Sequence, residues 1–172
     1  MFLTMMTLLA VSSGPVVTDV LAQSELGKVM CVNPDAATKT CSSILSYKAQ
    51  ADGSLIETGE VLISPDQPLT LEMSTIVKVR DGAICGAVEL ADMQRGRLRM
   101  DGTLFPPDRN EAALNKLLEK LKPMAGREAC EVLRIENGEL RKYGQVERID
   151  LKLPGKPVSW INPADGYRVA PR

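Results

Sequence analysis

The sequence contains no histidine, and this absence excludes much of enzyme chemistry. Serine and cysteine nucleophiles of the common catalytic triads depend on a histidine base, and catalytic zinc sites usually use histidine ligands. Neither of the common phosphate-binding glycine loops occurs in the chain. Paired carboxylates remain as an acid–base system, and two pairs at i, i+3 spacing are candidates: Glu89 with Asp92, and Glu128 with Glu131.

Aromatic residues are scarce, at 3% of the chain. Enzymes that cleave glycans need a pair of carboxylates, and they usually need aromatic platforms for the sugar as well. The simpler explanation of the candidate carboxylates is a solvated charged surface. A small carboxylate-dependent hydrolase or lyase acting on an envelope glycan is therefore the alternative hypothesis, and a non-enzymatic role is favoured.

The aromatic residues that do lie close together are near the C-terminus, in residues 160–167. Trp160 and Tyr167 form a candidate recognition surface, because Trp and Tyr dominate the energetics of binding interfaces. The alternative is that Trp160 packs the C-terminal tail onto the core of the domain.

Charge of one sign does not predominate, since the formal net charge is −1. A protein with this balance is not suited to long-range capture of nucleic acid, so we expect no nucleic-acid partner. One local stripe stands out: Arg95, Arg97 and Arg99 alternate with other residues and would share one face of a strand. The stripe is a candidate contact for an anion, or else the solvated face of an edge strand.

Long hydrophobic runs are absent after residue 22, so we expect no membrane span in the mature protein. Residues 1–22 are predicted to be an export signal, because a short apolar run is broken by Gly14-Pro15 and followed by small or modest residues up to Ala22. Cleavage before Gln23 would leave residues 23–172 as a single domain, periplasmic or secreted. The alternative is that the apolar run forms a buried N-terminal strand or helix of the mature fold.

Four cysteines follow the predicted signal, and they allow three disulfide pairings. We favour Cys31 with Cys41, because the loop between them contains a turn-forming Asn-Pro-Asp sequence, and therefore Cys85 with Cys130. A zinc site would need closely spaced cysteine pairs, which the chain lacks. We expect two structural disulfides, no metal and no cofactor.

Turn dipeptides separate several strand-like segments. Asp52-Gly53, Asp81-Gly82 and Asn137-Gly138 are strong hairpin signals, because type I′ turns need positive φ at both central residues. Asp101-Gly102 is a weaker case. The hairpins are expected from residues 44–50 with 55–63, 75–80 with 83–88, and 132–135 with 139–146.

One amphipathic helix is predicted over residues 108–121, with Asp108 as its N-cap. Leucines at i, i+3, i+4 and i+7 give it an apolar stripe: Leu114, Leu117, Leu118 and Leu121. Shorter helical turns are expected over 34–43 and 90–94. The proline-rich segment from residue 145 onward is expected to form an edge strand and an ordered tail.

These elements predict an α+β fold, in which antiparallel β-hairpins form one or two twisted sheets packed by one main amphipathic helix. Four short motifs, at residues 62–65, 84–86, 126–130 and 160–167, resemble small exported proteins of alphaproteobacteria. The resemblance implies a periplasmic or secreted setting and carries no activity with it. We therefore expect an exported, non-enzymatic binding or interaction module, whose partner is a protein, a glycan or a small anion of the cell envelope.

Overall fold

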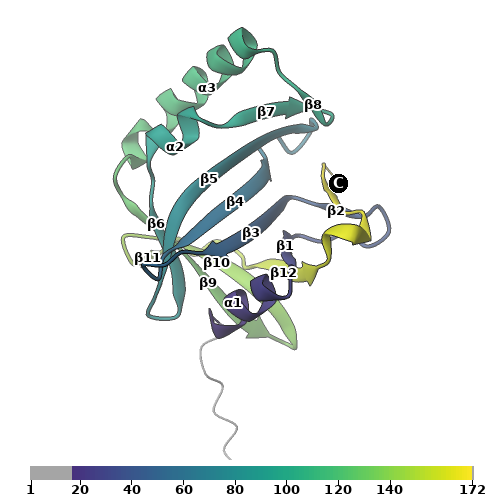
Figure 1. Ribbon diagram of the computed structural model, residues 1–172, viewed down its shortest axis with the longest axis vertical. Coiled ribbons are helices and arrows are strands. Elements are labelled where there is room, and N and C mark those ends of the chain that lie inside the picture. Colours follow the sequence, from purple (N-terminus) through teal and green to yellow (C-terminus); the bar gives the residue numbers. More distant parts are fainter. Residues whose placement is uncertain (1–16, 172) are drawn as a thin grey trace, which may run out of the picture.

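A closed β-barrel dominates the computed structural model, which describes residues 17–171. Eight antiparallel strands follow one another around the ring in the order β4-β3-β1-β12-β10-β9-β6-β5, and β5 pairs back with β4 (Figure 1). The barrel strands are β1 (Val29–Val32), β3 (Ser43–Ala49), β4 (Leu55–Leu62), β5 (Leu69–Arg80), β6 (Ala83–Ala87), β9 (Glu128–Glu136), β10 (Glu139–Val146) and β12 (Lys156–Ile161).

The predicted α+β fold is therefore wrong, because the hairpins do not form sheets that a helix covers. Each barrel strand turns alternate side chains into a shared interior, so the sheet buries its own apolar face by closing on itself. Closure also removes the exposed edges that an open sheet would leave. Buried side chains from the strands and from one helix make up this core: Val20, Met30, Val32, Leu45, Tyr47, Leu55, Val77, Ile84, Leu133 and Val158.

The predicted hairpins are present as β3–β4, β5–β6 and β9–β10, and the weaker one as β7 (Arg97–Met100) with β8 (Thr103–Leu104). Asp81 and Gly82 both have positive φ, 50° and 80°, as a type I′ turn requires. The first hairpin has a longer loop, in which Asp52 Oδ1 accepts hydrogen bonds from the amide (3.0 Å) and the hydroxyl (2.6 Å) of Ser54.

Helix α3 (Pro107–Leu121) forms as predicted, and its buried residues are Leu114 and Leu118. Leu114 packs against Leu71 of β5 and Leu98 of β7, so α3 lies across one end of the barrel rather than over a sheet face (Figure 1). The predicted cap is wrong by two positions. The N-cap is Pro106, with a proline at the first helical position, and no side chain caps the helix. The short helix α2 (Leu90–Gln94) also forms, while the 3₁₀ turn η1 (Lys122–Met124) follows α3.

Two predictions for other segments are wrong. Residues 34–43 form no helix, because the chain turns back at once into β2 (Thr40–Cys41), which pairs with β13 (Arg168–Val169). The C-terminal segment supplies β12, which lies between β1 and β10 rather than at an edge. Pro157 is tolerated there because only two residue pairs join β12 to β10, and its carbonyl accepts a hydrogen bond from Asn33 N (2.8 Å). The remaining elements are β11 (Ile149–Asp150) and η2 (Pro163–Asp165).

Helix α1 (Val17–Glu25) lies at the end of the molecule opposite α3 (Figure 1). Val20 is fully buried in the barrel core, and Ser24 Oγ donates a hydrogen bond to the carbonyl of Tyr47. Residues 17–22, the end of the predicted export signal, lie in this helix, so cleavage before Gln23 would remove the buried Val20 from the barrel core. The rest of the signal, residues 1–16, lies outside the described residues.

No helix within residues 17–171 combines the length and the apolar character needed to cross a bilayer.

Both predicted disulfides are present. Cys31–Cys41 joins β1 to β2 with 5.5 Å between the Cα atoms, and Cys85–Cys130 joins β6 to β9 with 4.0 Å. Two disulfides indicate an oxidising, non-cytoplasmic location.

Candidate functional site

Four polar side chains lie among the apolar residues inside the barrel, one from each of four strands: Tyr47, Glu57, Glu131 and Lys142. The strand register places them there. Tyr47 is opposite Glu57 on the inward face of β3 and β4. Glu131 is opposite the core residue Ile84, and Lys142 is opposite the core residue Leu133. Polar groups at inward positions cost free energy unless they make hydrogen bonds or ion pairs with one another or with a ligand.

A cavity of about 190 Å³ opens beside these groups, next to α2. Its walls combine carboxylates, from Glu57, Glu89 and Glu131, with apolar side chains that include Met73 and Met93. Gly86 also lines the cavity, and a Cβ at this position would crowd Ile76 O and Val77 Cγ1, each at 3.1 Å. Helix α2, which supplies Met93, is fastened to β5 by a hydrogen bond from Thr75 Oγ1 to Asp92 Oδ2 (2.8 Å).

The two inward carboxylates have different surroundings. Glu131 Oε1 accepts an ion-paired hydrogen bond from Lys142 Nζ at 2.5 Å, and the Lys142 side chain is only 11% exposed. Glu131 Oε2 is buried and has no hydrogen-bond partner within the described residues. Burial, and after it the charge of Glu131, raise the pKa of Glu57 to about 7, against the opposing effects of Lys142 and Tyr47. Glu57 therefore titrates near neutral pH.

Tyr47 is 5% exposed and turns its hydroxyl toward these carboxylates. The hydroxyl lies close enough to Glu57 to influence its pKa, but it makes no hydrogen bond of normal geometry within the described chain. Burial raises the pKa of Tyr47, and the charges of Glu57 and Glu131 raise it further. The hydroxyl is thus a neutral donor beside Glu57.

The fold separates the two members of each predicted carboxylate pair. Glu89 and Glu131 line the cavity, whereas Asp92 bonds to Thr75 and Arg95 and Glu128 pairs with Arg80. Sequence reasoning missed Glu57. The signal was present, because Glu57 shares the alternating inward phase of β4 with Leu55 and Val61, which are packed in the core.

The arginine stripe lies on β7 and in the turn before it, and each arginine has a carboxylate partner. Arg95 pairs with Asp92, while Arg97 and Arg99 both pair with Glu72 of β5. Burial alone would raise the pKa of Glu72, but the hydrogen bonds and charges of Arg97 and Arg99 outweigh it and lower the pKa. The anion-contact prediction therefore concerns arginines that already carry internal partners.

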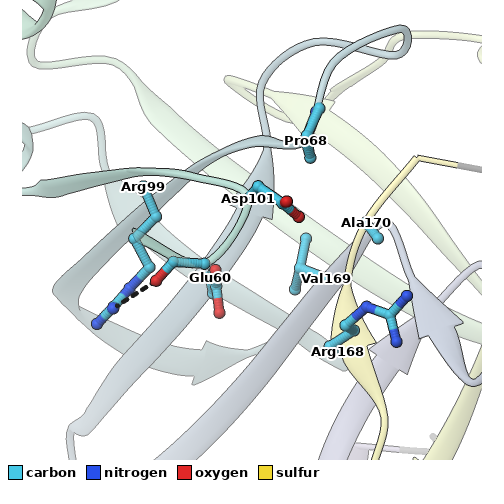
Figure 2. Close-up of a pocket in the computed structure, with 8 residues that line it drawn as sticks. Glu60, Pro68, Arg99, Asp101, Arg168, Val169 and Ala170 are labelled. Carbon is cyan, nitrogen blue, oxygen red and sulfur yellow. Dashed lines mark hydrogen bonds between the residues drawn. The ribbon is translucent and has the colours of Figure 1, made fainter. Parts of the chain in front are cut away.

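Arg99 also lines an open hollow of about 310 Å³ near the C-terminus (Figure 2). The hollow contains two arginines and two carboxylates, from Arg99, Arg168, Glu60 and Asp101. Glu60 is engaged by the hydroxyl of Thr70 at 2.6 Å. The balance of charge in this hollow does not favour a ligand of either sign.

Trp160 and Tyr167 are not brought together into one surface. Trp160 is on β12 and packs against the barrel core, with its ring edge-on to Tyr47 at a centroid distance of 6.4 Å. Tyr167 packs outside the barrel against the buried Cys31–Cys41 disulfide, with Lys39 Nζ 6.0 Å from its ring centre. Trp160 therefore belongs to the interior that contains the candidate site.

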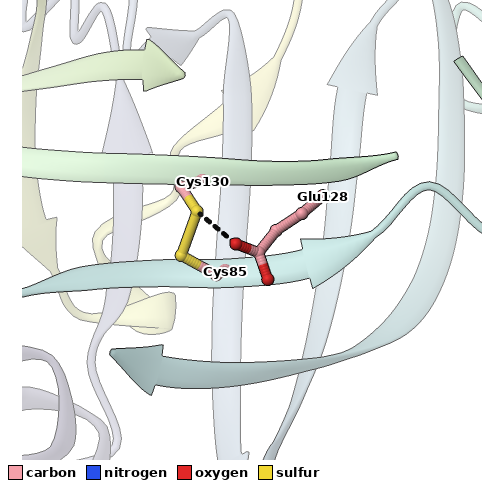
Figure 3. A group of neighbouring side chains, drawn as sticks. All are labelled: Cys85, Glu128 and Cys130. Atoms are coloured by element: carbon pink, nitrogen blue, oxygen red, sulfur yellow. Dashed lines mark hydrogen bonds between the residues drawn. A yellow bond between two sulfur atoms is a disulfide. The ribbon is translucent and has the colours of Figure 1, made fainter. Parts of the chain in front are cut away.

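Among the described residues, Cys85, Glu128 and Cys130 bring three atoms of metal-ligand type within 4.8 Å of one another (Figure 3). The two sulfur atoms are bonded to each other, so neither is a thiolate that could bind a metal. Glu128 Oε1 lies 3.8 Å from Cys130 Sγ, and its other oxygen is paired with Arg80. The group is a disulfide with a neighbouring ion pair on the outer face of the barrel.

Comparison of the chain with protein-family models, with curated proteins and with solved structures finds no match.

Proposed function

We propose that this protein is a non-enzymatic, extracytoplasmic binding protein that holds a small molecule in the mouth of its β-barrel. The observation that supports the proposal most directly is the cavity of about 190 Å³, where apolar walls meet the inward carboxylates of Glu57 and Glu131. Ligand sites in proteins typically combine an apolar lining with a few placed polar groups, and the mouth of a barrel is a frequent location.

The volume limits the ligand. Drug-sized ligands occupy pockets of roughly 300–1,000 Å³, while a dry cavity of about 150 Å³ is large enough for benzene. A cavity of about 190 Å³ therefore suits a molecule slightly larger than benzene, or one end of a longer molecule. A whole glycan or a folded protein does not fit inside it, so of the expected partners (a protein, a glycan or a small anion) only the last has a size that agrees with the cavity.

A carboxylate-dependent hydrolase or lyase is the second candidate. It is favoured by Glu57, which has a pKa of about 7 beside the second carboxylate of Glu131, as a general acid paired with a base would require. The ion pair between Glu131 and Lys142 weakens this candidate, because it engages the group that would act as base or nucleophile.

Filling the cavity tests the binding proposal. Ala129 lines the cavity, so Ala129→Leu should occupy its volume, whereas Ala112→Leu adds the same side chain to an exposed position of α3. We expect small apolar or amphipathic fragments to shift the NMR methyl signals of Val77, Ile84, Met73 and Met93 in the wild type and in Ala112→Leu, but not in Ala129→Leu. If no fragment shifts these signals, or if Ala129→Leu binds as the wild type does, the proposal fails.

The periplasmic or secreted location is part of the same proposal. The two disulfides support an oxidising compartment, and the predicted export signal and the resemblance to exported proteins agree with it. Intact-mass measurement of protein from the cell envelope or the medium should find a chain that begins at Gln23, so the exported protein would lack Val20 of α1 in its core. Recovery of only the full-length chain from the cytosol, with free thiols, would contradict the location.

A further inference from the structure

The charged groups that face the cavity carry a net negative charge. Glu57 from β4 is faced by Glu131 from β9, by Lys142 from β10 and by the hydroxyl of Tyr47 from β3, and Glu89 beside α2 lines the same space. The one cation in this group, Lys142, is already paired with Glu131. When Glu57 is ionised, three carboxylates are therefore opposed by a single ammonium group.

Unused hydrogen-bonding capacity points in the same direction. Glu131 Oε2 is a buried acceptor without a partner among the described residues, and the neighbouring Glu57 offers a second carboxylate. The Tyr47 hydroxyl, 5% exposed and likewise unpartnered there, is a donor that can bond to a carboxylate once that carboxylate is held ionised. A positively charged ligand with several hydrogen-bond donors would donate to Glu131 Oε2 and to the carboxylate of Glu57. The Tyr47 hydroxyl would then donate its own hydrogen bond to Glu57.

We infer that the ligand is a small organic cation, with a primary ammonium group held between the carboxylates of Glu57 and Glu131 and a short apolar body against Met73, Met93 and Val77. This inference rests on the proposed binding function and specifies its ligand class. An anion would meet the carboxylates at close range in an environment of low dielectric, where repulsion between like charges is strong. A neutral apolar molecule would leave the buried acceptor of Glu131 without a donor.

Ammonium binding is coupled to the proton on Glu57. The pKa of Glu57 is about 7, so the ionised fraction of this carboxyl group rises about tenfold between pH 6 and pH 8. Alkylamines, like the lysine side chain, stay protonated to about pH 10. Affinity for an amine should therefore rise about tenfold over this range, while affinity for a neutral molecule of the same shape should not.

The test compares probe molecules that share the same apolar body and differ only in their polar head group. Benzylamine, benzyl alcohol and benzoate form one matched set, and butylamine, butanol and butyrate form another. Each probe is titrated into the full chain, with binding measured by calorimetry and located by the NMR methyl signals of the cavity. We expect the two amines to bind at least about tenfold more tightly than their neutral counterparts at pH 8, and the two carboxylates not to bind.

Substitution of single glutamates then locates the charge. Glu57→Gln keeps the shape of the side chain but removes its charge, and it should weaken amine binding by about ten- to a hundredfold at pH 8 and abolish the rise with pH. Glu111→Gln, at an exposed position of α3, is the matched control and should bind amines as the wild type does.

The outcomes separate the two proposals. If an alcohol or a carboxylate binds in the cavity as tightly as its amine, or if Glu57→Gln leaves amine affinity and its pH dependence unchanged, the ligand class is wrong while the binding function stands. If no probe of any class shifts the cavity signals, both the ligand class and the binding function are overturned.

Discussion

Tyr47 and Glu57 are directly opposite each other on β3 and β4, with both side chains turned into the barrel. The pairing sets a buried phenol beside a carboxylate whose pKa is raised to about 7, in a ring where the neighbouring inward residues are mainly apolar. A barrel built only for stability would fill these positions with apolar side chains, since interior positions of small barrels are usually packed.

Glu57 should make the protein less stable as the pH rises. Between pH 4.5, the ordinary pKa of a glutamate, and about pH 7, the folded protein keeps a proton on Glu57 that the unfolded chain has released. The free energy of unfolding therefore falls across this window. Glu57→Gln should match the wild type near pH 4.5 and exceed it by about 1–3 kcal/mol at pH 8.

Urea unfolding at pH 4.5, 6, 7 and 8 measures this difference. Glu111→Gln serves as the control again, and it should follow the wild type at every pH. A Glu57→Gln variant whose stability fell with pH as steeply as that of the wild type would show that another group is responsible.

Leucine substitutions in α3 should separate its buried face from its exposed face. Leu114 packs against Leu71 and Leu98, so Leu114→Ala should lower the free energy of unfolding by about 2–5 kcal/mol. Lys116→Ala, on the exposed side of the helix, should change it by no more than about 0.5 kcal/mol. Chemical denaturation of both variants measures the free energy of unfolding. An equal decrease in the two variants would mean that α3 does not pack on β5 and β7.

The two disulfides should contribute unequally. In the chain-entropy model, the longer loop closed by Cys85–Cys130 contributes about 4 kcal/mol and the shorter loop closed by Cys31–Cys41 about 3 kcal/mol. Paired substitution to alanine at each bridge, followed by urea unfolding, measures these losses. Peptide mapping without reduction should find the same two pairs, and any peptide that joined Cys31 or Cys41 to Cys130 would refute the pairing.

The arginine stripe should prove to be structural rather than a site for anions. Arg97 and Arg99 are paired with Glu72, and Arg95 with Asp92, so changing all three arginines to glutamine should cost only about 1 kcal/mol in stability. Pull-downs from envelope extract at low and high salt should recover the same partners for the variant and the wild type. A salt-sensitive partner that is lost only with the variant would restore the anion-contact hypothesis.

Local signals in the sequence predicted the hairpins, the disulfides and α3, while the closure of the barrel left no comparable signal. Asp81-Gly82 and Asn137-Gly138 specify their turns by backbone conformation alone. Closure depends on β1 pairing with β12, between Met30 and Trp160 for example, and no nearby residue indicates that contact. The prolines of the C-terminal segment favoured an edge strand, although a short junction with β10 accommodates Pro157 within the ring.

Only some residues of the candidate site could be predicted from the sequence. Glu128 and Glu131 were paired on the assumption of a helix, where residues three apart share a face. They lie on β9, where side chains alternate, so Glu128 points outward beside Cys130 and Glu131 points into the barrel. The alternation of inward and outward side chains along a strand was therefore the better criterion. Applied to β4, it would have identified Glu57 as an inward residue.

The pairing of β1 with β12 also constrains the order in which the chain can fold. Val29 pairs with Ile161, so β1, one of the first strands to be synthesised, cannot pair with β12 until that late strand has also been made. The ring cannot close before then. Until then the inward faces of the hairpins and the free edges of β1 and β10 are exposed, which is the kind of intermediate that aggregates or needs a chaperone. A chain that ends before Lys156 would remain in that open state, so the final segment acts as the late, committing step of assembly.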